Sequence, residues 1–335
     1  MIGVVLALAL LQVDPDALAN RARELAAEGK LEQAEALWRQ AAASAPTHFP
    51  SLFNLGYLSV QRQQDAEAII WLRRAAQVNA RDFNTQYLLG ACHSRLGHNN
   101  DALRAWRAAL ALQPTNRKLM QAMSVEYSKG RYFEEAARVA ELALRVAPED
   151  ESLYYLARQA RQDAAQLEEA FALAKRALAR FPLSARANFE VGFHLHKTGR
   201  LDEAIPYFDK AITADPSYEE PYYFRGDVLL RREQPVLAAA AFRSALERRK
   251  EYTVARLALA RALIAQEKLD AAVVELEEAT RQDPENAQPY LLLSQTYFRL
   301  GRADAAKAAK ETSQRLRAAN PEALNAPQSR PFPPR

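Results

Sequence analysis

Residues 185–218 read ARANFEVGFHLHKTGRLDEAIPYFDKAITADPSY and contain two apolar stripes separated by a turn signal. In the first half, Phe189 and Phe193 recur at helical spacing. Gly199 then interrupts the pattern, because glycine ends helices at low cost. The second half carries another apolar stripe at spacings of three and four, and it stops at Pro216. This stretch therefore predicts two antiparallel helices joined by a tight turn.

The same pattern recurs every 34 residues along the chain. Alanine occupies one position of every unit, namely Ala34, Ala68, Ala102, Ala136, Ala170, Ala204, Ala238, Ala272 and Ala306. A second ladder, seven residues further on, runs in the same steps from Ala41 to Ala279, and Ser313 takes its ninth position. Because no insertion or deletion breaks this period, the sequence predicts one array of identical helix pairs rather than several globular domains.

Small residues also fill one column of the predicted first helices: Ala22, Gly56, Gly90, Ser124, Gly192, Gly226, Ala260 and Ser294. With the first alanine ladder, they allow the two helix axes of a unit to approach closely. Bulky residues are expected to fill the remaining gaps, namely Trp38, Leu72, Trp106, Phe208, Phe242 and Leu276. Arg158 replaces the small residue in the fifth unit, and we expect its side chain to extend outward into solvent. The alternative is a hinge or a basic contact at this unit.

These features resemble the tetratricopeptide repeat, whose 34-residue unit has a hydrophobic–small pair, two alanines and a closing proline. The pairs here are Leu55-Gly56, Leu89-Gly90 and Val191-Gly192, and the prolines are Pro46, Pro114, Pro148, Pro182, Pro216 and Pro284. The resemblance covers nine units over residues 15–320 and implies an all-α, right-handed superhelical solenoid. It also implies a non-catalytic scaffold that binds a protein or an extended peptide on its concave face. We expect such a scaffold to serve the assembly of a multiprotein complex.

In this family the first helices line the concave face, so their variable columns form the candidate partner groove. Aromatic rings concentrate in two neighbouring columns, and aromatic side chains give a large contact area at low entropic cost. The candidate groove residues are Phe53, Tyr57, Tyr87, Tyr155, Gln159, Phe189, Phe193 and Tyr223. The alternative is that such rings pack between repeats. For Tyr155, Phe189 and Tyr223 the sequence leaves both interpretations open.

No motif in the sequence indicates catalytic chemistry. Glycine-rich phosphate loops and the H-E-x-x-H and G-x-S-x-G strings do not occur. Cys92 is the only cysteine, which excludes an intramolecular disulfide and a cysteine-based zinc site. His93 falls in an internal helix column, where we expect a packed core residue. We therefore expect no enzymatic activity, no cofactor and no metal.

The charge balance, 45 basic to 41 acidic residues, gives no footprint of a nucleic-acid-binding protein. Two alternative functions remain open. The first is the recognition arm of a separately encoded transferase, similar to the repeats of O-GlcNAc transferases. Their asparagine ladder is matched here only by Asn20 and Asn54. The second and less favoured alternative is an RNA-binding helical repeat.

The two ends of the chain differ from the array. Residues 1–14 begin MIGVVLALALLQ, which is too short to span a bilayer and resembles the apolar part of a secretory signal. We therefore expect export to the periplasm and no stable membrane span in the mature array. The alternative is a cytoplasmic protein in which this segment caps the array. Residues 321–335, PEALNAPQSRPFPPR, are expected to be disordered or extended, and could dock in a proline-binding groove.

Overall fold

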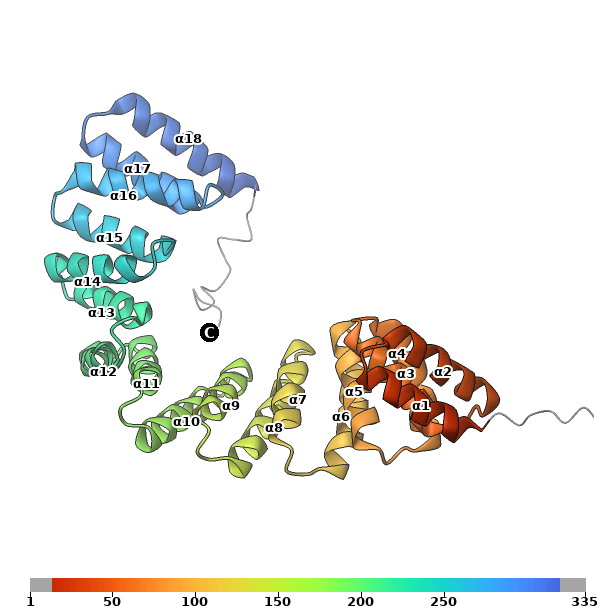
Figure 1. The fold of residues 1–335 in the computed structure, drawn as a ribbon. Coiled ribbons are helices and arrows are strands. Elements are labelled where there is room, and N and C mark those ends of the chain that lie inside the picture. Colours follow the sequence, from red (N-terminus) through yellow and green to blue (C-terminus); the bar gives the residue numbers. More distant parts are fainter. Residues whose placement is uncertain (1–13, 320–335) are drawn as a thin grey trace, which may run out of the picture. The chain divides into compact units, whose positions relative to one another are not determined.

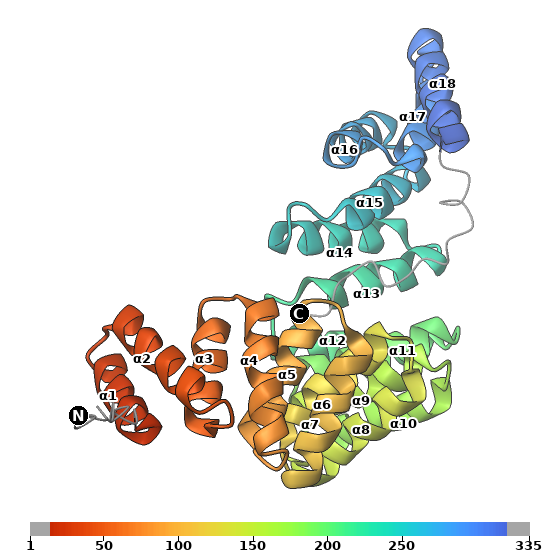
Figure 2. The same ribbon diagram turned by 90° about the vertical axis from the view of Figure 1, so that its right-hand side faces the viewer.

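The computed structural model describes residues 14–319, which form eighteen α-helices without a β-strand. The segments expected at the two ends, residues 1–13 and 320–335, lie outside the described residues. Within α1–α8 and α11–α18, each odd-numbered helix packs against the even-numbered helix that follows it (Figures 1 and 2). The prediction of an all-α array of consecutive helix pairs is therefore confirmed.

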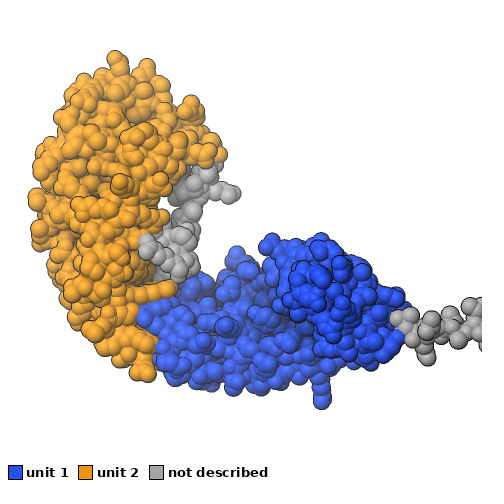
Figure 3. Space-filling model, viewed as in Figure 1, with its two compact units in different colours: residues 1–173 blue, residues 174–335 orange. Residues whose placement is uncertain are grey.

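The chain divides into two compact units, residues 1–173 and 174–335 (Figure 3). The helices of the first unit are α1 Pro15–Ala27, α2 Leu31–Ser44, α3 Phe49–Gln61, α4 Asp65–Val78, α5 Phe83–Arg95, α6 Asn99–Leu112, α7 Arg117–Lys129, α8 Phe133–Val146 and α9 Glu151–Asp163. Helix α10, Leu167–Arg180, contains the boundary. The second unit continues with α11 Ala185–Lys197, α12 Leu201–Ala214, α13 Glu219–Arg231, α14 Pro235–Arg248, α15 Thr253–Ala265, α16 Leu269–Gln282, α17 Ala287–Arg299 and α18 Ala303–Ala319.

The turn inside each helix pair contains one residue in the left-handed backbone region. These residues recur every 34 positions with φ between 59° and 79°, and they are Gly29, Gln63, Gly97, Arg131, Ala165, Gly199, Glu233, Glu267 and Gly301. After α5, for example, the N–H of Gly97 donates to the carbonyl of Ser94 at 3.1 Å, and that of His98 to His93 at 2.8 Å. This pattern is the Schellman motif, which satisfies the last carbonyls of a helix.

Replacing Gln63 by glycine is expected to stabilise the protein. Gln63 adopts the left-handed backbone conformation, which costs an L-residue about 1–2 kcal/mol of folding free energy. Glycine adopts this conformation without strain and loses only about 0.5–1 kcal/mol through its larger backbone entropy in the unfolded chain. The Gln63→Gly variant should therefore gain up to about 1 kcal/mol, measured by denaturant unfolding. The matched control is Gly97→Ala, which should lose a similar amount. An unchanged stability in both variants would contradict this account of the turn.

The small column and the bulky column face each other, as the sequence predicted. A Cβ atom added at Gly56 would lie 2.6 Å from Cγ of Leu72, and one added at Gly226 would lie 2.7 Å from Cε1 of Phe242. Where the column holds serine, the two helices are close enough for the hydroxyl to form a hydrogen bond to the backbone of the second helix. Ser124 Oγ donates to the Ala136 carbonyl at 2.9 Å. The first helix of each such pair therefore approaches the backbone of its partner, which explains the requirement for small residues.

Arg158 is buried, with 5% of its surface exposed, so the expectation that it extends outward is wrong. Its Nη1 donates to Gln162 Oε1 at 2.8 Å, so the same helix supplies a polar partner within the interior. Arg161, one turn away, donates from Nε to Glu141 Oε1 at 2.6 Å. Helix α9 thus accommodates both arginines through hydrogen-bonding partners on α8 and on α9 itself.

Candidate partner-binding surface

Three of the residues predicted to line the groove are buried. Phe189, Phe193 and Tyr155 expose only 5%, 6% and 6% of their surface. In the second unit, the ring of Phe189 stacks on Phe193 with centroids 5.8 Å apart, and Phe224 of α13 meets Phe193 edge-on at 5.0 Å. Their burial removes these rings from the surface that a partner could contact.

Tyr223 is packed among aromatic rings in the same way. The centroid of its ring lies 4.9 Å from that of Phe224, 5.8 Å from that of Phe242 and 5.4 Å from that of Tyr252. The pKa of the Tyr223 phenol is raised to about 12, mainly by burial and to a smaller extent by the negative charge of the nearby Asp227. Gln159, by contrast, is half-buried on α9 and donates to Asp163 Oδ1 at 2.7 Å.

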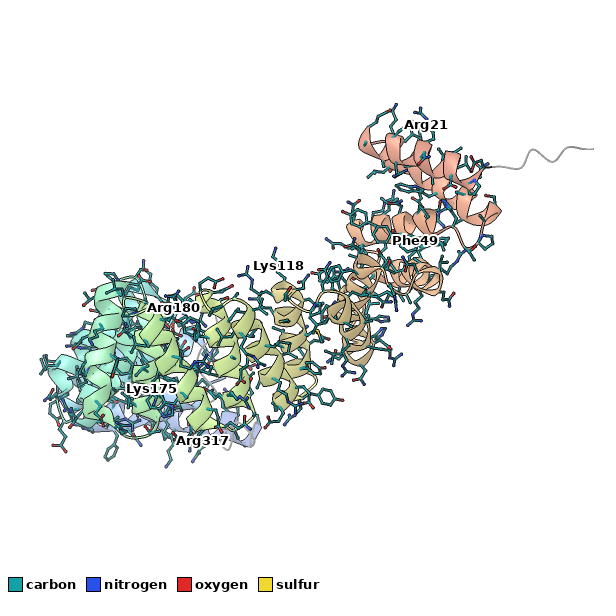
Figure 4. The ribbon with its side chains drawn as sticks, turned by 90° about the horizontal axis from the view of Figure 1, so that it is seen from below. Arg21, Phe49, Lys118, Lys175, Arg180 and Arg317 are labelled. Atoms are coloured by element: carbon teal, nitrogen blue, oxygen red, sulfur yellow. The ribbon has the colours of Figure 1, made fainter. Side chains whose placement is uncertain are left out.

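The remaining predicted aromatics lie on the first helices of the first unit. On α3, Phe49 stacks on Phe53 at 5.9 Å and Phe53 stacks on Tyr57 at 6.2 Å, and Tyr57 is 44% exposed. On α5, one repeat further, Phe83 stacks on Tyr87 at 5.8 Å. We call these five residues the aromatic stripe. Figure 4 labels Phe49, where the stripe begins. The four other rings are half-buried, so each is anchored in the unit.

An open cavity of about 490 Å³ lies between the first helices of the third, fourth and fifth repeats. Its lining comes from α5 (Ser94), α6 (Trp106), α7 (Gln121, Ala122, Val125, Glu126 and Lys129) and α9 (Ser152 and Leu156). Gln121 and Val125 occupy the two columns in which the sequence analysis placed the groove. The indole Nε1 of Trp106 donates to the Tyr87 carbonyl at 3.0 Å, so the cavity adjoins the aromatic stripe.

The cavity is lined by both apolar and polar side chains. Val125 is 46% exposed and contributes apolar surface. The carboxylate of Glu126 is only 1% exposed and accepts hydrogen bonds from Ser94 Oγ at 2.7 Å and Lys129 Nζ at 3.0 Å, whereas the Lys129 side chain is 52% exposed. These polar residues were not predicted from the sequence, because their pairing joins α5 to α7 and follows no repeated column. Such a lining suits contacts with both apolar and polar groups of a partner.

The described residues offer little reactive chemistry. Within residues 14–319, no three His, Cys, Asp or Glu side chains come together as a metal site would require. Cys92 is buried, and burial raises the pKa of its thiol to about 12, which makes it a poor nucleophile. His93 is a buried core residue, as predicted, and burial lowers its pKa despite the opposing effect of Asp101. Over the same range, no helix combines the length and the apolar character needed to cross a membrane.

In the second unit, one polar contact links the first helices of consecutive repeats. His196 Nε2 on α11 lies 2.6 Å from Asp227 Oδ2 on α13, and Arg231 Nε donates to the same oxygen at 2.8 Å. Burial by itself would raise the pKa of Asp227. The hydrogen bond from His196 and the charge of Arg231 overcome this effect, so the pKa of Asp227 lies below its ordinary value.

The stability of this unit is expected to depend on Asp227 in acid. Since the pKa of its carboxyl is lower in the folded state than the value of about 3.9 in an unfolded chain, its stabilising contribution is complete well above pH 4. That contribution is lost as the pH falls through the folded-state pKa. In thermal unfolding experiments, the Asp227→Asn variant should therefore lose stability less steeply than the wild type below about pH 4. An identical slope in the two proteins would contradict this role.

Stacked helix pairs of constant length define an α-solenoid, and comparison with known proteins gives its family. Profiles described as Tetratricopeptide repeat match residues 20–82, 159–219, 229–282 and 263–326, which together include more than half of the chain. The chain therefore belongs to the tetratricopeptide repeat family.

Solved structures of similar fold include bacterial and other repeat proteins. The Pseudomonas aeruginosa protein pilF is 20% identical over 62% of this chain and 93% of its own, with a TM-score of 0.54. PilW, a widely conserved type IV pilus biogenesis factor, is 26% identical over 64% of this chain and 96% of its own, with a TM-score of 0.52. The APC/C hetero-tetramer Cut9-Hcn1 is 14% identical over 93% of this chain, with a TM-score of 0.54, and this chain covers 62% of the matched chain. At these identities, pilF and Cut9-Hcn1 show the shared fold alone.

Proposed function

We propose that this protein is a non-catalytic scaffold that binds a partner protein or an extended peptide on the first-helix face of its first unit. The observation that carries the proposal is the open cavity between α5, α7 and α9 beside the aromatic stripe. Its lining includes both apolar and hydrogen-bonding side chains, which suit the side chains and the backbone amides of a bound peptide. Half-buried aromatic rings add contact area without a large entropic cost.

The partner is proposed to belong to a multiprotein complex at the bacterial envelope. Support comes from PilW, a type IV pilus biogenesis factor that shares 26% identity with this chain over 64% of its length. The apolar segment at residues 1–14 supports export to the periplasm, with a cytoplasmic location as the alternative. The near balance of basic and acidic residues favours a protein partner over a nucleic acid.

The proposal is tested by placing a charge in the cavity. Val125 is 46% exposed, so Val125→Arg should leave the fold intact while blocking the apolar surface that Val125 contributes. The partner captured from native cells by the wild-type protein should be lost from this variant. Ile70 on α4 is 61% exposed and does not line the cavity, so Ile70→Arg is the matched control and should retain the partner. Retention by Val125→Arg, or equal loss from both variants, would contradict the proposal.

A further inference from the structure

We propose that the aromatic stripe of one copy binds the proline-rich segment 327–335 of a second copy of the chain. This inference rests on the proposed function, since it assigns an occupant to the same first-helix face. The described structure ends at Ala319, and the chain continues through residues 320–335. That stretch contains PFPPR at residues 331–335, a phenylalanine placed among three prolines.

The rings of the stripe are suited to proline. A proline-rich segment favours the polyproline II conformation before binding and therefore loses less entropy on binding than a flexible peptide, and aromatic-lined grooves recognise it through its pyrrolidine rings. On α3, Phe49, Phe53 and Tyr57 stack in succession and present Tyr57 at 44% exposure. The eight steps of the helix from Phe49 to Tyr57 rise by about 12 Å. The four steps from Pro331 to Arg335 in polyproline II also cover about 12 Å, so PFPPR matches the length of this row.

Charge favours the same occupant. Asp16 on α1 exposes 80% of its side chain, and its Oδ1 lies 3.1 Å from Nε2 of His48, the residue immediately before Phe49. A carboxylate therefore stands at the Phe49 end of the stripe. In the segment, Arg330 and Arg335 flank residues 331–334, PFPP. An arginine seated near Asp16 would form a charge-assisted contact and fix the direction in which the segment lies.

Binding between copies would join the beginning of one chain to the end of another. Such a contact uses two different surfaces and is therefore heterologous, so it can extend from copy to copy. Self-association of the full-length chain should consequently rise with protein concentration and disappear when residues 320–335 are removed.

The test uses the chain lacking residues 320–335 and a labelled synthetic peptide of residues 321–335. Fluorescence anisotropy should show saturable binding, weakened by about tenfold or more in Tyr57→Ala, because an aromatic anchor is lost. The matched control is Tyr132→Ala at the start of α8, which is 45% exposed and outside the stripe, and it should bind as the parent does. Replacing the prolines of the peptide by alanine should abolish binding, and Asp16→Asn should weaken it most at low salt.

Several outcomes would overturn the inference. Absence of binding at millimolar peptide, or equal weakening by Tyr57→Ala and Tyr132→Ala, would show that the stripe does not receive this segment. Peptide binding combined with a full-length chain that stays monomeric at all concentrations would rule out a second copy as its source. None of these results bears on the Val125→Arg capture experiment, so the inference can fail while the proposed function stands.

Discussion

The Phe189→Ala variant is expected to lose about 3–5 kcal/mol of folding free energy, the range measured when a buried phenylalanine is truncated. Phe189 is 5% exposed, and its ring contacts Phe193, Phe208 and Phe224, so its removal leaves a cavity that three helices border. Because contacts in a repeat array join neighbours, the second unit should unfold first. Denaturant unfolding followed by circular dichroism measures the effect.

The control for this variant is Tyr57→Ala, a truncation in the first unit of a ring that is 44% exposed. It should cost less than about 1 kcal/mol, because most surface substitutions have small effects. A combined Tyr155→Ala, Phe189→Ala, Tyr223→Ala variant should therefore fail to fold rather than lose a partner from an intact protein. If it kept its helicity and melting temperature, the packing assigned to these rings would be contradicted.

The Gly90→Ala variant is expected to be the most disruptive single-methyl change in the array. An added Cβ would overlap the indole of Trp106, which is buried and donates to the Tyr87 carbonyl at 3.0 Å. Overpacking of this kind costs about 1–3 kcal/mol, and a broken hydrogen bond adds about 1 kcal/mol. The shift of the ring would also distort the cavity that Trp106 lines. Thermal unfolding measures the loss.

A compensating substitution sharpens this prediction. In the eighth repeat, Ala260 and Leu276 occupy the two corresponding positions, and both are fully buried. The double variant Gly90→Ala, Trp106→Leu should therefore be more stable than the sum of its two single variants implies, which a double-mutant cycle detects. Strict additivity would mean that residues 90 and 106 do not compete for the same space.

The repeat architecture was predictable because the scaffold positions recur. The alanine ladders, the small column opposite Leu72 and Phe242, and the turns that end each first helix all follow the 34-residue period. Each is a local requirement of one helix pair that the chain repeats without interruption. The periodicity therefore predicted the pairing of helices and the close approach of their backbones.

The candidate surface was less predictable, because burial within one column depends on the next repeat. Tyr57 and Phe193 occupy the same position of their units, yet they are 44% and 6% exposed. The ring of Phe224 covers Phe193 at 5.0 Å, whereas the residue at the corresponding position after Tyr57 is Leu88, which has no ring. The pairing of Glu126 with Ser94 likewise joins residues that no single column relates. The position within the repeat thus predicted which side chains lie on the candidate groove columns of the first helices. It did not predict which of them a side chain of the next repeat covers.

A partner is expected to contact the cavity between α5, α7 and α9. Site-specific photocrosslinking in native cells tests this contact most directly, with a photoreactive residue at position 125 and, in a separate variant, at position 70. Both side chains are exposed, at 46% and 61%, but only residue 125 lines the cavity. We expect a discrete crosslinked protein from position 125 and none from position 70. Crosslinking from position 70 alone, or the same products from both positions, would contradict this expectation.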